Sequence, residues 1–181
     1  FVTLITAFAN LFGLGGAPLC AMARGKGNRD GAQGIMVNAG FMLLLSGAVL
    51  TVLGIAFHRP LLYLFGASDN IIGYAEDYIT IYLLGTVFVM FSLGLNAFIS
   101  AQGFATTAML SVLIGAVSNI VLDPIFIFVL NMGVRGAALA TVLSQGISCV
   151  WVVSFLMGKK TSLRLKTQNM RIDMKLLAPC I

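Results

Sequence analysis

The sequence predicts an all-α integral membrane protein, a polytopic helix bundle with about five transmembrane helices. Of the 181 residues, 59% are hydrophobic and only 9% are charged, against about 25% charged residues in soluble domains. The mean hydropathy is +1.00. Five stretches are long and apolar enough to form helices of about 20 residues, the length that crosses a hydrocarbon core about 30 Å thick.

The five predicted spans are separated by short connectors. They cover residues 1–23, 32–57, 76–101, 107–130 and 136–157. The connector at 58–73 is too mixed to cross a membrane, and we expect in it a short interfacial helix from Pro60 to Phe65 that breaks at Gly66. Because the chain begins inside an apolar run, we expect a fragment of a longer protein. Residues 1–157 would form a partial N-terminal bundle, 158–175 a basic linker and 176–181 the start of a further span.

Basic residues are divided unevenly between the two sides of the predicted bundle. Nine of the eleven Lys and Arg residues lie in the connectors 24–30 and 158–175, and only Arg59 and Arg135 lie on the other side. An excess of Lys and Arg marks cytoplasmic loops, which places 24–30, 102–106 and 158–175 in the cytoplasm. The net charge of +5 therefore reflects membrane topology and not nucleic-acid binding. We favour a solvated linker at 158–175 over a segment that binds anionic lipid headgroups.

Each span carries small or polar residues at helical spacing, which predicts a common polar interior. The stripes are Thr3, Thr6, Asn10, Gly13 and Ala17; Asn38, Met42 and Ser46; Ser92, Asn96 and Ser100; Ser111, Gly115, Ser118 or Asn119, and Asp123; and Ala137, Thr141, Ser144 or Gln145, and Ser148. Membrane helices also pack through small residues, and this alternative is favoured for most of these positions. As weaker assignments, Asn38, Met42 and Asn96 are candidates for lining a cavity.

One stretch, SNIVLDPIFIF, combines an amide, a carboxylate and a proline within an apolar span. A charge at membrane depth is costly, so the Asp123 carboxylate must pair, bind a cation or be protonated. Asn119 lies one helical turn earlier on the same face. Pro124 cannot donate to the carbonyl of Ile120, which predicts a helix bend and a free oxygen. These groups are suited to a hard cation or a proton-carrying acid, and we favour this over a simple hydrogen bond to a neighbouring helix.

Motifs of enzymes, nucleotide sites and metal sites are absent from the sequence. The segment ending at Lys26 lacks the first glycine and the final Ser or Thr of a phosphate-binding loop. Neither GxSxG, HExxH nor CxxC occurs, and His58 is the only histidine. We therefore expect no enzyme, no cofactor and no metal, with sodium at Asp123 as the one exception. The three cysteines are widely separated and are expected to be packing residues: Cys20, Cys149 and Cys180.

Three segments resemble the multidrug and toxic compound extrusion (MATE) transporters. The run GLGGAPLCAMARGKGNRDGA at 13–32 looks like the end of their second helix and the following cytoplasmic loop. LSVLIGAVSNIVLDPIFIF at 110–128 and GVRGAALATVLSQ at 133–145 look like their fifth and sixth helices. The resemblance covers essentially the whole chain. It implies a twelve-helix protein of two six-helix lobes in the cell membrane, plasma or inner, in which this chain supplies helices two to six.

The resemblance also implies a function and a site. Organic, often cationic, compounds are exported in exchange for protons or sodium ions, and the missing C-terminal lobe is the partner of this one. The cation site of the first lobe would use Asn119 and Asp123 with Thr141 from the next helix. The chain turns near 131–135, which places Asp123 and Thr141 at similar depth. Many members carry a further acid on the first helix, which this sequence lacks.

Two other functions stay open at this point. A lipid-linked oligosaccharide flippase of the same superfamily would need a cationic cavity, and none of the five stripes contains Lys or Arg. In a non-transporting membrane assembly protein, Asp123 would only join helices. Ion-dependent substrate binding separates an antiporter from this second alternative.

Overall fold

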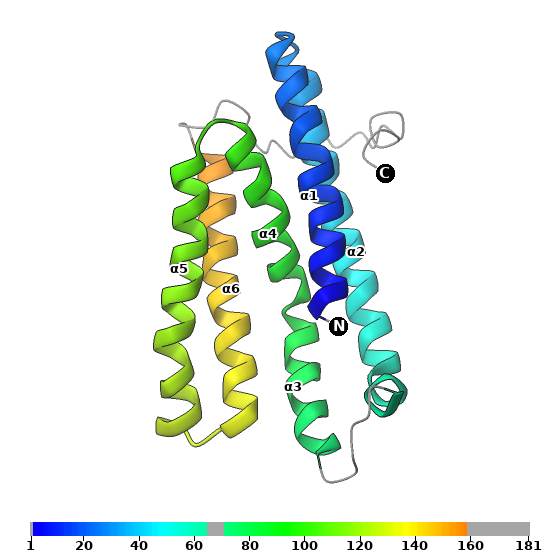
Figure 1. Ribbon diagram of the computed structural model, residues 1–181, viewed down its shortest axis with the longest axis vertical. Helices are drawn as coiled ribbons and strands as arrows, with labels where there is room; N and C mark the ends of the chain where they lie inside the picture. Colours follow the sequence, from blue (N-terminus) through cyan, green and yellow to red (C-terminus); the bar gives the residue numbers. More distant parts are fainter. Residues whose placement is uncertain (1, 65–70, 159–181) are drawn as a thin grey trace.

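A computed structural model describes residues 2–64 and 71–158, and this part of the chain is helical, without strands (Figure 1). The elements in order are α1 (Val2–Gly25), α2 (Arg29–Leu64), α3 (Ile72–Leu84), α4 (Thr86–Ala101), α5 (Ala105–Pro124), the π-helical turn η1 (Ile125–Val129) and α6 (Gly133–Met157). The predicted all-α membrane bundle is confirmed. The predicted linker after Gly158 and the further span at 176–181 lie outside the described residues.

Four described segments are long and apolar enough to cross a membrane, and α3 with α4 makes a fifth if this bent pair is one span. The predicted and observed boundaries agree closely for α1 and α6. The end of α2 differs from the separate interfacial helix expected from Pro60, although the membrane segment within α2 does end at Pro60. The expected end at Phe65 and the break at Gly66 lie outside the described residues. Helix α2 continues through Pro60 to Leu64, and Figure 1 shows its last turns directed away from the rest of the helix. A proline has a helical φ, and near a helix end it removes only one hydrogen bond.

The helices form a bundle in which α4 is central. Helix α1 packs on α2 and α4, α5 packs on α6, and α4 contacts α1, α2, α5 and α6. The main buried cluster lies between α1, α2 and α4, with α6 closing one end through Val152 and Leu156. Its largest side chains that are fully buried include Phe98, Met36 and Leu43. Many large apolar side chains are also exposed on the outer faces of the helices, as a lipid-facing surface requires.

Polar contacts define the two ends of the bundle. At one end the guanidinium of Arg24 donates to the carbonyl oxygen of Gln102 at 2.8 Å, so the connectors after α1 and α4 lie together. At the other end Arg59 pairs with Glu76 at 2.6 Å and Arg135 pairs with Asp77 at 2.9 Å. For the described connectors, the grouping used to count charges by side therefore matches the structure, and the basic segment after Gly158 lies outside the described residues. The assignment of the Arg24 end to the cytoplasm remains a prediction.

Glycines allow the closest helix contacts in the core. A methyl group at Gly13 of α1 would lie 2.8 Å from the carbonyl oxygen and 2.9 Å from the Cα of Gly94 in α4. Gly16 of the same helix receives the ring of Phe98, which would lie 2.7 Å from a methyl group there. These contacts agree with the packing interpretation of the glycine cluster in the first span.

The third predicted span is broken at Gly85, where α3 and α4 meet at an angle of 52°. The sequence did not predict this bend. The hydroxyl of Thr51 in α2 donates to the carbonyl oxygen of Leu83 at 3.0 Å, so a neighbouring helix supplies a partner at the break. Val142 of α6 packs against Gly85, where a methyl group would lie 2.5 Å from its Cγ2 atom. Contacts from α2 and α6 therefore hold the bend.

Replacement of Thr86 by valine is expected to stabilise the protein. The Thr86 hydroxyl, directly after the bend, is fully buried and has no hydrogen-bond partner in the described structure. A buried polar group without a partner costs about 1–3 kcal/mol, and an apolar group of the same shape removes this cost. Thermal unfolding of the full-length protein in detergent should show a higher midpoint for Thr86→Val. A lower midpoint would mean that the hydroxyl has a partner and would contradict this account.

Candidate cation site

The polar pair predicted in the fourth span lies together on α5. The amide nitrogen of Asn119 donates to Oδ1 of Asp123 at 3.3 Å, across one turn of helix, and both residues are half-buried. In this arrangement Asn119 is a hydrogen-bond partner of the acid. This bond uses Oδ1 of Asp123, so Oδ2 can accept a proton or bind a cation.

Pro124 changes the type of helix beside the acid. The α-helical pattern of α5 ends at Pro124, and η1 follows directly. The N–H of Leu130 donates to the carbonyl of Ile125, five residues earlier, at 3.0 Å. Residues 105–129 nevertheless form one continuous candidate membrane span, whereas α3 and α4 are separated by a bend of 52° at Gly85. The proline removes the usual donor to the carbonyl of Ile120, and π-helical turns of this kind occur often at functional sites.

The register between α5 and α6 places Thr141 at the depth of Asp123. A methyl group at Gly115 of α5 would lie 3.4 Å from Cβ of Ser148, and one at Gly136 of α6 would lie 2.7 Å from the carbonyl oxygen of Phe126. These helices are antiparallel neighbours, and Gly115 lies level with Ser148. Asp123 is eight residues after Gly115, so it lies level with the residue eight positions before Ser148, which is residue 140. Thr141 is therefore within one residue of the level of Asp123.

Thr141 does not bond to the acid in this structure. Its hydroxyl donates to the carbonyl of Ala137 in its own helix at 2.9 Å. The described residues thus show Asn119 and Asp123 in contact and Thr141 at their level, with its hydroxyl engaged elsewhere. The χ1 angle of threonine has two accessible states in helices. Rotation about χ1 can therefore direct the Thr141 hydroxyl oxygen toward a bound cation instead of toward its own helix.

Polar residues of three stripes form a chain of buried and partly buried hydrogen bonds between helices. Ser92 donates to the hydroxyl oxygen of Ser148 at 2.9 Å, and Ser148 donates to the carbonyl of Ser111 at 2.9 Å. Ser111 donates to the amide oxygen of Asn96 at 2.8 Å. The chain joins α4, α5 and α6. These positions therefore serve helix packing, which was the favoured alternative for most of the stripes.

The three candidate cavity residues lie inside the bundle. Asn38 is buried on α2, Met42 packs partly buried against the main core cluster, and Asn96 joins the serine chain between α4 and α5. None of the three lines the apolar pocket formed by α3.

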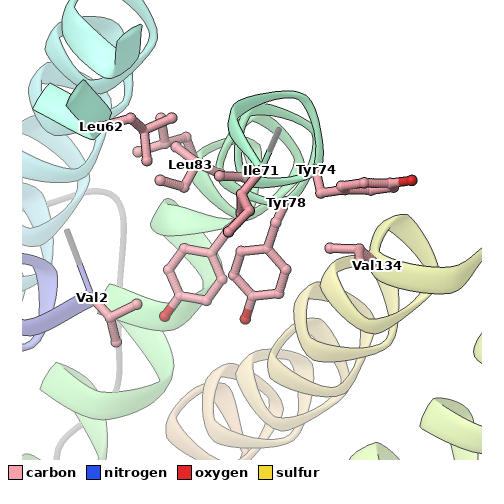
Figure 2. A pocket seen from close by; sticks show the side chains of 10 residues that line it. Val2, Leu62, Ile71, Tyr74, Tyr78, Leu83 and Val134 are labelled. Carbon is pink, nitrogen blue, oxygen red and sulfur yellow. The ribbon is translucent and has the colours of Figure 1, made fainter. Parts of the chain in front are cut away.

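An apolar pocket that sequence reasoning missed lies beside α3, at the end of the bundle opposite Arg24 (Figure 2). It encloses about 530 Å³, within the range of small-molecule sites. Figure 2 shows its side chains gathered between α1, α2, α3 and α6. Tyr78 and Tyr82 stack with ring centroids 6.1 Å apart. The lining residues are Val2, Leu62, Ile71, Tyr74, Ala75, Tyr78, Ile79, Tyr82, Leu83 and Val134.

The signal for this pocket is a repeat of tyrosines. Tyr74, Tyr78 and Tyr82 follow one another at four-residue spacing, which places them on one face of α3. The two acids between them, Glu76 and Asp77, face away to Arg59 of α2 and Arg135 of α6. Within residues 2–64 and 71–158, no three His, Cys, Asp or Glu side chains come together as a metal site.

The apolar helices and the buried polar contacts between them are those of a multi-pass membrane helix bundle. A family model described as MatE matches residues 1–125. The chain therefore belongs to the MATE family, as the resemblance in its sequence implied.

Relatives and solved structures agree with this assignment. The chain is 29% identical to a protein of Staphylococcus haemolyticus named multidrug export protein MepA, over 92% of this chain and 37% of that protein. It is 30% identical to the probable multidrug resistance protein YpnP of Bacillus subtilis, over 87% of this chain and 36% of that protein. The chain thus spans little more than a third of the length of these relatives.

Two solved structures of MATE transporters match the fold. One, described as the inward-facing conformation of a multidrug resistance MATE family transporter, has a TM-score of 0.92 and 28% identity over 97% of this chain and 40% of that one. An outward-facing conformation has a TM-score of 0.91 and 29% identity over 97% and 39%. The chain therefore matches the corresponding parts of the inward-facing and the outward-facing structures about equally well.

Proposed function

We propose that the chain is the N-terminal lobe, helices two to six, of a cation-coupled antiporter that exports organic and often cationic compounds through the cell membrane. The observation that carries the proposal is Asp123, an acid inside a membrane span that contacts Asn119 and lies level with Thr141. Protons or sodium ions are the coupling ions. The protein acts as a transporter without an enzymatic step and needs no cofactor, and the second lobe of the same chain completes the pathway.

Asp123 performs the coupling through its change of charge. As a free carboxylate inside a span it is costly, and a bound proton or sodium ion lowers that cost. The cation therefore favours the conformation in which the acid is least solvated, and coupling follows because the ion binds the two conformations with different affinity. Asn119 holds the carboxylate in place, Thr141 supplies a hydroxyl oxygen from α6, and the Ile120 carbonyl beside Pro124 is a further acceptor.

The pocket on α3 is suited to the substrate. Its lining is apolar apart from tyrosine hydroxyl groups, and the faces of aromatic rings attract organic cations. Relatives bear the names multidrug export protein and probable multidrug resistance protein, which supports small organic compounds as cargo. A pocket without Lys or Arg does not favour the lipid-linked oligosaccharide flippase, because that substrate carries a pyrophosphate.

Movement of whole lobes accounts for alternating access. Similarity to both the inward-facing and the outward-facing structures supports a lobe that moves largely as one body against the other lobe. Rigid-body rotation of this kind is a common form of transport switching. A non-transporting assembly protein, the remaining alternative, has no named relative among those compared above.

Transport by the full-length protein in liposomes tests the proposal. A proton gradient or a sodium gradient is imposed across the membrane, and movement of a fluorescent organic cation is followed against its own gradient. We expect one of the two gradients to drive uphill movement and an ionophore for that ion to stop it. Uphill movement that needs neither ion, or no ion-dependent movement at all, would contradict cation coupling.

A further inference from the structure

We propose that Gly85 and Val142 are positioning residues for the cation site, because their contact sets the place of Thr141 relative to Asp123. This inference rests on the proposed function and adds two residues to it. Val142 is the next residue after Thr141 on α6 and packs against the bend between α3 and α4. Through this contact the third span, which carries no ligand of the cation, acts on the site.

The contact at Gly85 leaves no room for a side chain. A methyl group there would lie 2.5 Å from Cγ2, 2.7 Å from Cγ1 and 3.0 Å from Cβ of Val142. Valine is β-branched and in helices keeps one strongly preferred χ1 rotamer, so its side chain cannot turn both methyl groups away. Backbone conformation does not require the glycine, since its φ is −85°. The residue is therefore needed for space.

The other face of α6 is fixed against η1 and α5. A methyl group at Gly136 would meet the backbone of Phe126 at 2.7 Å, and Ser148 lies against Gly115 and donates to the carbonyl of Ser111 at 2.9 Å. Val142 is midway between Gly136 and Ser148 along α6. A contact with η1 at Gly136 and contacts with α5 at Ser148 therefore lie on either side of Thr141 along α6, and the contact of Val142 with Gly85 lies between them. A change at Gly85 is transmitted to the interface that faces Asp123.

Helix α2 also contacts the bend, on the side away from α6, so the bend cannot easily move away from Val142. Thr51 of α2 donates to the carbonyl of Leu83 at 3.0 Å, and Leu83 itself fills the space beside Gly54, where a methyl group would lie 2.5 Å away. Because α2 supports the bend from behind, a larger residue at position 85 is expected to displace α6. A displacement of about 1 Å can lower the efficiency of a precisely positioned site about 100-fold.

A double-mutant cycle in the full-length protein tests the positioning role. The concentration of the driving cation that gives half-maximal drug transport, and the maximal rate, are measured for Gly85→Ala, Val142→Ala and the double variant. We expect Gly85→Ala to raise the half-maximal concentration about 10-fold with a smaller effect on maximal rate. The double variant should return to within about 3-fold of the unchanged protein, because the smaller side chain at 142 gives the new methyl group room.

Gly73→Ala is the matched control. It places the same substitution near the start of α3, where a methyl group has no neighbour within 4 Å among the described residues, and it should leave cation dependence unchanged. If Gly85→Ala does not fold, the half-maximal cation concentration of Val142→Ala tests the positioning role by itself. Loss of the contact should then raise the half-maximal concentration about 3-fold, and an unchanged value would overturn the proposal.

Two further results would overturn the positioning role. One is a normal cation dependence in folded Gly85→Ala. The other is a double variant as impaired as Gly85→Ala, which would mean that the glycine is needed for something other than the space that Val142 fills. Either result leaves the proposed function intact as long as Asp123→Asn abolishes coupling. If Asp123→Asn keeps normal coupling, the proposed function fails whatever the Gly85 variants do.

Discussion

Asparagine at position 123 is expected to remove cation-driven export while leaving the protein folded. The amide has nearly the shape of the carboxylate, but it cannot ionise or exchange a proton, so the cation no longer distinguishes the two conformations. A coupling free energy of about 1–3 kcal/mol, typical for linked sites, predicts a loss of about 5- to 150-fold in gradient-driven transport. The measurement is uphill drug uptake by full-length protein in liposomes under the gradient that drives the unchanged protein.

Asp30→Asn is the control for this experiment. Asp30 is an exposed acid in the first turn of α2, at the end of the bundle opposite the tyrosine pocket. Its substitution should leave coupling unchanged, and Asp123→Glu, which keeps an ionisable group, should retain part of it. Full gradient-driven transport by Asp123→Asn at normal expression would show that another residue couples the ion.

Gly13→Ala is expected to lower stability by about 1–3 kcal/mol, the usual cost of overpacking a well-packed core. The new methyl group would lie 2.8 Å from the carbonyl oxygen and 2.9 Å from the Cα of Gly94. Both atoms belong to the backbone of α4, so no side chain can rotate away and the helices must separate. Thermal unfolding of the full-length protein in detergent should therefore show a lower midpoint.

Gly25→Ala provides the matched comparison for that measurement. Gly25 ends the same helix, and in the part of the chain that the structure describes a methyl group there has no neighbour within 4 Å. We expect an unchanged or slightly higher midpoint, because alanine is the better helix former. Equal midpoints for Gly13→Ala and Gly25→Ala would mean that α1 and α4 do not approach as closely as described.

Much of the fold follows from local sequence properties. Lengths of apolar runs predict where α1 ends and where α6 begins and ends to within a few residues, because a hydrocarbon layer sets the length of a span. Helical periodicity likewise predicts that Asn119 and Asp123 share a face. The depth of Thr141 follows from the short turn between α5 and α6, which fixes their register.

The bend at Gly85 could not be predicted in the same way. It depends on Val142 and Thr51, which are far from it in sequence and reach it only after α6 and α2 have packed. At Pro60 the sequence predicts the start of a separate helix, whereas α2 continues through this residue. A proline marks a helix end only on average. Near the end of α2 the lost hydrogen bond is a small cost.

The polar stripes were ambiguous for a physical reason. Helical spacing tells which residues share a face, but the rotation of each helix decides whether that face meets a cavity or another helix. Ser92, Ser111 and Ser148 turn toward neighbouring helices and bond to them. The tyrosines of α3 form a pocket only because the ends of α1, α2 and α6 surround them, and no property of α3 alone contains that information.

Binding of an organic cation to the purified full-length protein tests the coupling role of Asp123 most directly. Drug affinity is measured at increasing concentrations of protons and, separately, of sodium ions, for the unchanged protein and for Asp123→Asn. We predict that one of the two ions weakens drug binding progressively in the unchanged protein and has no such effect in the variant. The same dependence on that ion in both proteins would contradict the account.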